Sequence, residues 1–170
     1  MNGPEQIARA SLAGAEHVPL GHGPADACLR GGLKRAVLHE VFAHPGHEGA
    51  ATGFAAGAAA RIAAQKPLLW IRQDYSALEF GELAATGLLE FGLDPARIFL
   101  FAAAHAEDAL RAALDALSCA ALGAIVIEIP GEPKILDLVA SRRLTLAAAQ
   151  NNVTPLLLRF AATPDASTAE

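Results

Sequence analysis

Cysteine, aromatic residues and long apolar runs are all scarce in this sequence of 170 residues. The two cysteines, Cys28 and Cys119, lie far apart and have no CxxC or His/Cys ligand spacing beside them, which predicts buried thiols in a reducing compartment. The apolar runs fall short of the roughly 20 residues that a membrane span needs. The start, MNGPEQIARASLAG, lacks the apolar core of a secretory signal. We therefore expect a cytoplasmic protein with no membrane contact.

Positive charge is also in short supply. Lysine and arginine total 13 against 18 acidic residues, which gives a net charge of -5 and a pI near 5.6. Non-specific binding to nucleic acid depends on a basic footprint, so this balance argues against strong intrinsic DNA binding. The hydrophobic content of 53% and the charged content of 18% are typical of a single globular α/β or all-α domain.

What the sequence does contain is an alternation of short apolar runs and helical periods. The apolar runs are continuous, as in strands that helices cover on both sides. Five strands separated by helices predict right-handed crossovers and a mainly parallel, doubly wound α/β sheet whose functional edge is the carboxyl end of the strands. The expected strands span 35–43, 67–73, 97–103, 124–130 and 154–160, and the expected helices span 49–65, 81–92, 106–121 and 135–152.

The chain divides into three parts. An amino-terminal helix over Glu5–Glu16 and a Gly/Pro/His loop make up residues 1–23. A core domain occupies 24–160, and a small polar tail over 161–170 is expected to be frayed. The amino-terminal helix leaves two alternatives open, because it could dock on a neighbouring copy or fold back on its own domain.

The stretch EVFAHPGHEGAATGFAAG, residues 40–57, reads as a strand, a tight loop and a helix, which is the setting of a phosphate-binding loop. Aligning Gly49 with the last glycine of G-x-x-x-x-G-K-[ST] puts Ala50 at the lysine and Ala51 at the hydroxyl that binds magnesium. Both groups that handle charge are missing. The degenerate loop consists of His44, Pro45, Gly46, His47, Glu48, Gly49, Ala50, Ala51 and Thr52.

A turn retained for packing is the favoured interpretation of this loop. A weak anion site is the alternative, since the loop keeps its glycines and a helix amino terminus, and His44 and His47 could add charge at low pH. Glu48 would repel the anion. The same two histidines have no further ligands nearby in sequence, so no metal is expected. Ser118 and Ser141 have no neighbouring base, which leaves no hydrolase signature and no catalytic residue.

Longer segments carry a family resemblance. The run ADACLRGGLKRAVLHEVFAHPGHEGAATGFAAGAAARIA and the later LDLVASRRLTLAAAQNNVTPLLLR resemble the ImuA family, RecA-like and SulA-related proteins of bacterial damage-inducible mutagenesis, over about residues 25–159. The resemblance implies a RecA-like three-layer α/β/α core and a role in SOS-linked translesion synthesis. It also implies two partners, an ImuB-like relative of the Y-family polymerases and an error-prone replicative-type polymerase. Members of the family usually continue past the fifth strand, so we do not expect the resemblance to carry over the partner contacts of that region.

The same resemblance suggests where other site positions lie. RecA-like ATPases carry a carboxylate after the second core strand, where this chain has Asp74, and a Walker B acid at the position of Glu128. Without the loop lysine we interpret both as vestigial or structural. The fourth strand is followed only by the short PGEPK, too little for a DNA-gripping loop. Arg142 and Arg143 either are solvated or contact an acidic partner or a DNA phosphate.

Three functions follow as hypotheses. The favoured one is a non-catalytic RecA-like adaptor of translesion synthesis that needs no cofactor and acts through protein contacts. The second is a weak ATP-binding or ATP-hydrolysing protein that uses the altered loop with Asp74 and Glu128. The third is a SulA-like inhibitor of cell division. The missing lysine favours the adaptor over the hydrolase.

Overall fold

Five parallel strands form the main sheet in the computed structural model, which describes residues 16–170. The strands are β3 (His39–Ala43), β4 (Leu68–Gln73), β5 (Ile98–Ala103), β6 (Ala124–Glu128) and β7 (Thr154–Phe160). Their order across the sheet is β3-β7-β6-β4-β5, and every neighbouring pair is parallel. The predicted parallel α/β fold is confirmed.

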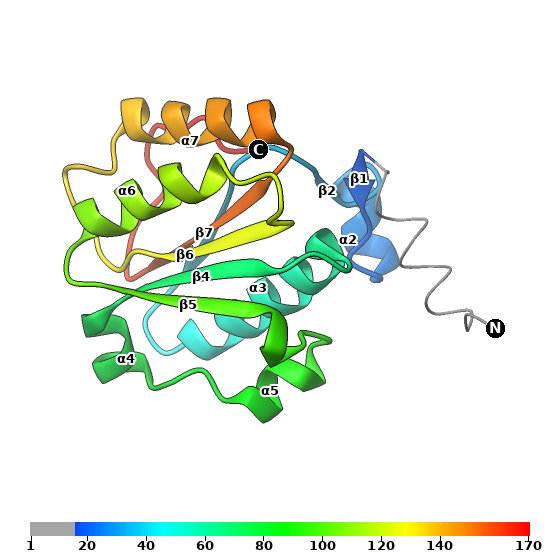
Figure 1. Ribbon diagram of the computed structural model, residues 1–170, viewed down its shortest axis with the longest axis horizontal. Helices are drawn as coiled ribbons and strands as arrows, with labels where there is room; N and C mark the ends of the chain where they lie inside the picture. Colours follow the sequence, from blue (N-terminus) through cyan, green and yellow to red (C-terminus); the bar gives the residue numbers. More distant parts are fainter. Residues whose placement is uncertain (1–15) are drawn as a thin grey trace.

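Helices cover both faces of the sheet (Figure 1). One face packs against α6 (Ala106–Leu117) and α7 (Leu138–Asn151), and the other against α3 (Glu48–Ala63), α4 (Asp74–Phe80) and α5 (Ala85–Glu90). A 3-10 turn, η1 (Pro95–Arg97), leads into β5. Before the main sheet, α2 (Gly23–Cys28) lies beside a small antiparallel ribbon of β1 (His17–Val18) and β2 (Leu33–Lys34).

The central strands explain why their sequences are continuously apolar. Every residue of β6 and of β7 is buried, because helices lie on both sides of these two strands. The edge strand β5 differs, since Phe99, Leu100 and Phe101 remain 61%, 62% and 42% exposed. The prediction that helices cover every strand on both sides is therefore wrong for β5, which lies at the outer edge of the sheet.

Helix α3 reaches the sheet through small side chains. Its buried positions are mostly alanines, and the helix ends where Gly123, just before β6, approaches it. A Cβ on Gly123 would lie 2.6 Å from the Cα of Ala63, closer than real Cβ contacts come, so this position requires glycine. Small residues on both elements therefore bring α3 close against the centre of the sheet.

Several predicted boundaries shift in the structure. The strand expected at 35–43 begins only at His39, because a turn with a positive φ at Ala36 precedes it. The helix expected at 81–92 shortens to α5, since Gly81 has a φ of +80 and ends the unpredicted helix α4. The helix predicted over 5–16 lies outside the described residues except for its last position.

Two other expectations differ from the structure. The tail over 161–170 returns along the domain, where the Glu170 N–H donates to the Leu38 carbonyl at 2.9 Å and the Ser167 hydroxyl to Glu40 at 2.8 Å. The prediction of a frayed tail is therefore wrong. Both Cys28 and Cys119 are exposed, because α2 buries none of its residues and Cys119 follows the end of α6.

Within residues 16–170, none of the helices is long and apolar enough to cross a bilayer.

Candidate functional site

The loop between β3 and α3 lies at the carboxyl end of its strand, where a phosphate-binding loop would lie. Residues 44–47 are exposed, and α3 begins at Glu48. Gly46 has a φ of +89, a backbone conformation that favours glycine, although a Cβ added at this position would meet open space. The loop thus keeps the shape of a turn into a helix amino terminus.

Glu48 supplies this loop with its own anion. The Gly46 N–H donates to both carboxylate oxygens of Glu48, at 3.1 Å to Oε1 and 2.9 Å to Oε2. Loop amides of this kind are what a P-loop offers to a phosphate. Because one of them is already bonded to a carboxylate, an incoming phosphate would meet negative charge and would have to displace Glu48.

The two positions at which a phosphate-binding loop carries its lysine and its hydroxyl differ in burial. Ala50, at the lysine position, is exposed. Ala51, at the magnesium hydroxyl position, is 7% exposed and belongs to the core cluster between α3 and the sheet. The sequence predicts the loss of both charge-handling groups. In the structure the hydroxyl position is also buried, so a hydroxyl placed at Ala51 would enter an apolar environment.

Glu128 ends β6 and is fully buried. Its Oε1 accepts a hydrogen bond from the Trp70 indole at 2.7 Å, and its Oε2 accepts one from the Arg72 Nε at 2.9 Å. The β4–β6 register puts Arg72 directly beside Glu128. Asp74, the other carboxylate that the resemblance indicates, is the exposed first residue of α4. The acid that a Walker B position would offer to magnesium is therefore paired with an arginine.

Arg72 connects three parts of the site. Besides Glu128, its Nη2 donates to the Gly81 carbonyl at 2.8 Å, and its Nη1 lies 3.5 Å from the Glu82 carboxylate. Burial raises the pKa of the Glu128 carboxyl, while Arg72 and Trp70 oppose that rise because they donate to the carboxylate. An arginine inside an apolar strand was the sequence signal for this pair, since a buried cation needs an acid.

The space beside these residues is small. A hollow of about 190 Å³ lies between the start of α3 and the α4–α5 connection, and Thr52, Arg72, Phe80 and Glu82 contribute to its lining. Typical ligand pockets measure roughly 300–1,000 Å³. Among residues 16–170, no group of three or more His, Cys, Asp or Glu side chains could hold a metal ion. The hollow is thus too small for a nucleotide, and the described part of the chain brings no such ligand set together.

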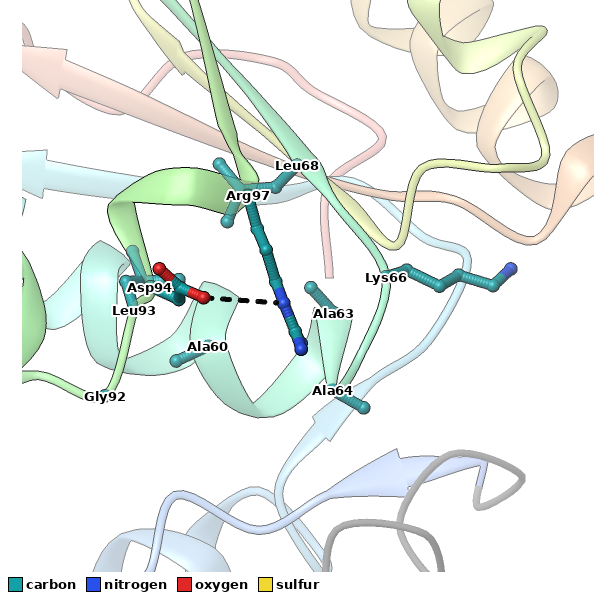
Figure 2. A pocket seen from close by; sticks show the side chains of 9 residues that line it. All are labelled: Ala60, Ala63, Ala64, Lys66, Leu68, Gly92, Leu93, Asp94 and Arg97. Atoms are coloured by element: carbon teal, nitrogen blue, oxygen red, sulfur yellow. Dashed lines mark ion pairs between the residues drawn. The ribbon is translucent and has the colours of Figure 1, made fainter.

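A second hollow, of about 110 Å³, lies at the opposite, amino end of β4 and β5 (Figure 2). There Arg97 lies 3.7 Å from Asp94 and donates to the Gln65 side chain at 2.8 Å. These contacts tie η1 to the end of α3. This hollow lies far in the fold from the loop at residue 46. We attribute it to the contact between η1 and the end of α3.

Arg142 and Arg143 lie on the exposed side of α7. The buried side of the helix carries Ser141, Leu144 and Ala148. No ion pair within residues 16–170 involves either arginine, and exposed apolar side chains flank them along the helix. These apolar neighbours are Leu138, Val139 and Leu146, which are 49%, 56% and 54% exposed. We call the five residues the α7 surface.

Known structures share this arrangement of strands and helices. The structure is similar to a RadB recombinase, with a TM-score of 0.59 and 18% identity over 84% of this chain and 70% of the RadB chain. The chain has a RecA-like fold. SulA from Pseudomonas aeruginosa matches with a TM-score of 0.53 and 21% identity over 72% of this chain and 97% of the SulA chain. No protein-family model matches the sequence, and no curated protein matches it.

We expect Mg-ATP to bind no more tightly than a Kd of about 1 mM, because the loop lacks cations and Glu48 opposes a phosphate. Titration calorimetry of the full chain measures this directly. Restoring Ala50→Lys and Ala51→Thr alone is expected to recover little, since Glu48 still holds the Gly46 N–H, whereas adding Glu48→Ala recovers part of the binding. Low-micromolar binding by the unaltered chain would contradict the inactive loop.

Proposed function

We propose that this chain is a non-catalytic RecA-like adaptor in SOS-induced error-prone translesion synthesis, and that it acts through protein contacts. The observation that carries the proposal is the internal neutralisation of the degenerate phosphate loop and of the Walker B position. Glu48 accepts a hydrogen bond from the Gly46 amide of the loop, and Arg72 pairs with the Glu128 carboxylate, so one amide that would face a phosphate and one acid that would face a magnesium ion each have a partner within the domain.

The fold remains complete while that site is closed. The parallel sheet and its covering helices form a rigid platform, and the α7 surface presents two arginines among apolar side chains. Arginine is enriched at interface centres, and the buried core of an interface is more apolar than the rest of the protein surface. The resemblance to the ImuA family supplies the context of the proposal, in which the partners are an ImuB-like protein and an error-prone replicative-type polymerase.

Co-purification tests this function. The full chain, co-expressed with an ImuB-like protein, is expected to elute with it as one complex in size-exclusion chromatography. A parallel co-expression with the tubulin-like division protein serves as the matched comparison. An ImuB-like complex without a division-protein complex supports the adaptor, and failure to bind the ImuB-like protein would overturn it.

A SulA-like inhibitor of division is the second candidate, because the structural match covers 97% of the SulA chain. The same pair of co-expressions separates the two functions. Binding to the division protein, together with filamentous growth of cells that express the chain, would replace the adaptor with this second candidate.

A further inference from the structure

Strand β5 leaves one edge of the sheet open. It pairs with β4 on its inner side, and within residues 16–170 no strand pairs with its outer side, where backbone N–H and C=O groups are unpaired. The other edge, β3, is protected by the tail that follows β7. There the Glu170 N–H donates to the carbonyl of Leu38, just before β3, at 2.9 Å, and the Ser167 hydroxyl donates to Glu40 at 2.8 Å.

The open edge is apolar on both faces. Because side chains alternate along a strand, Phe99 and Phe101 share the face that carries α6, and Leu100 points to the opposite face. A groove of about 500 Å³ between β5 and α6 is lined by Phe101 and by Asp108, Arg111 and Asp115 of α6. Helix α6 therefore leaves the outer side of both phenylalanines uncovered.

The usual protection of an edge strand is missing here. Natural edges are blunted by lysine, proline, bulges or a covering segment, because an open apolar edge pairs with other strands. Residues 98–103, with the sequence IFLFAA, contain neither a charge nor a proline. This combination of an unpaired backbone and exposed apolar side chains indicates a surface that takes a strand.

We propose that β5 pairs antiparallel with β5 of a second copy of this chain, with the two-fold axis at Leu100. The order Phe-Leu-Phe reads the same in both directions. A two-fold axis at Leu100 places Phe99 of one copy opposite Phe101 of the other, and Leu100 opposite its own equivalent. Cross-strand aromatic pairs are favourable, and this pairing juxtaposes no like charges along the strand.

The charged residues of α6 that line the groove fit the same two-fold symmetry. Asp108, Arg111 and Asp115 alternate in sign along α6 and line the groove beside β5. Two antiparallel copies of α6 can therefore place each Arg111 near a carboxylate of the other copy. Arg111 is 66% exposed and holds Glu107 and Asp108 only at 3.6 and 3.8 Å, so it is available for such a contact.

The buried area sets the expected strength of the pair. A large apolar side chain has a surface of about 150–250 Å². The exposed parts of Phe99, Leu100 and Phe101 therefore amount to about 300 Å² per copy, or about 600 Å² in a pair. Stable interfaces bury about 1,200–2,000 Å² in total, so strand backbone and the α6 rims must supply the rest. We therefore expect a reversible dimer. The proposal does not depend on the adaptor function or on the α7 surface.

Sedimentation velocity of the full chain tests the dimer. Between about 1 and 100 µM, a range suited to weak interfaces, the mass is expected to rise from 17.5 kDa toward twice that value. Leu100→Lys and Leu100→Glu are each expected to remain monomeric, because like charges would face one another across the axis. Mixing the two variants in equal amounts is expected to restore the dimer. Leu78→Lys, at an 84% exposed leucine of α4, is the matched control and should dimerise like the unaltered chain.

Four outcomes would overturn the proposal. A chain that stays monomeric across the whole range has no such interface. A Leu100→Lys variant that still dimerises uses another surface, and a monomeric mixture of the two variants excludes a two-fold axis at Leu100. Deleting residues 1–15 should leave the dimer intact. Loss of the dimer in that deletion would mean that β5 takes the amino-terminal segment of a neighbouring copy instead.

Discussion

Replacing Glu128 by alanine is expected to lower the free energy of unfolding by about 3–5 kcal/mol, because it leaves the charge of Arg72 buried without its partner. The Arg72 side chain is only 11% exposed, and its remaining contacts are the Gly81 carbonyl and a carboxylate 3.5 Å away. For a chain of this size the loss corresponds to a fall in melting temperature of about 10 °C. Urea and thermal unfolding measure both quantities.

A double variant separates the pair from the loss of packing. Arg72→Met with Glu128→Leu replaces both charges by apolar groups, and it is expected to regain most of the stability that the single change removes. Lys34→Met is the matched control, since the partly exposed ion pair of Lys34 with Glu170 contributes less than about 1 kcal/mol. If Glu128→Ala costs no more than this control, Arg72 does not need Glu128, and the internal neutralisation of the site is contradicted.

The central strands were predictable because their environment is uniform. β7 occupies the predicted range 154–160, since helices cover it on both sides and every residue along it is apolar or buried. The strand order is not written in any local pattern, so the exposed position of β5 could not be inferred from IFLFAA alone. Helix α4 was missed for a related reason: its seven residues carry only one buried side chain, Ser76, and therefore no apolar stripe.

The sequence predicted which charge-handling groups the site lacks. It did not predict the contacts that the remaining groups make with one another. The alanines at positions 50 and 51 are visible in a motif alignment, and repulsion of an anion by Glu48 follows from its charge. The bond from Gly46 to Glu48 depends on loop geometry, and the pairing of Glu128 with Arg72 depends on a register between strands 56 residues apart. Arg72 within an apolar strand was the one local signal of that pairing.

The α7 surface leads to the second large effect. Reversing both arginines, with Arg142→Glu and Arg143→Glu, is expected to abolish co-purification with an ImuB-like partner, because two attractive charges at an interface become repulsive. The melting temperature should change little. Both side chains are exposed, no ion pair within residues 16–170 involves them, and surface changes of this kind are usually within about 0.5 kcal/mol.

A charge-matched control makes this result specific. Arg30→Glu with Arg61→Glu alters the net charge equally at two exposed positions away from α7, and it should leave co-purification intact. A large fall in melting temperature of the α7 variant would make Arg142 and Arg143 structural. Retained co-purification at an unchanged melting temperature would place the partner contact elsewhere on the domain. Loss of the partner in the α7 variant alone ties recognition to these two arginines, because bulk charge and stability are then both held constant.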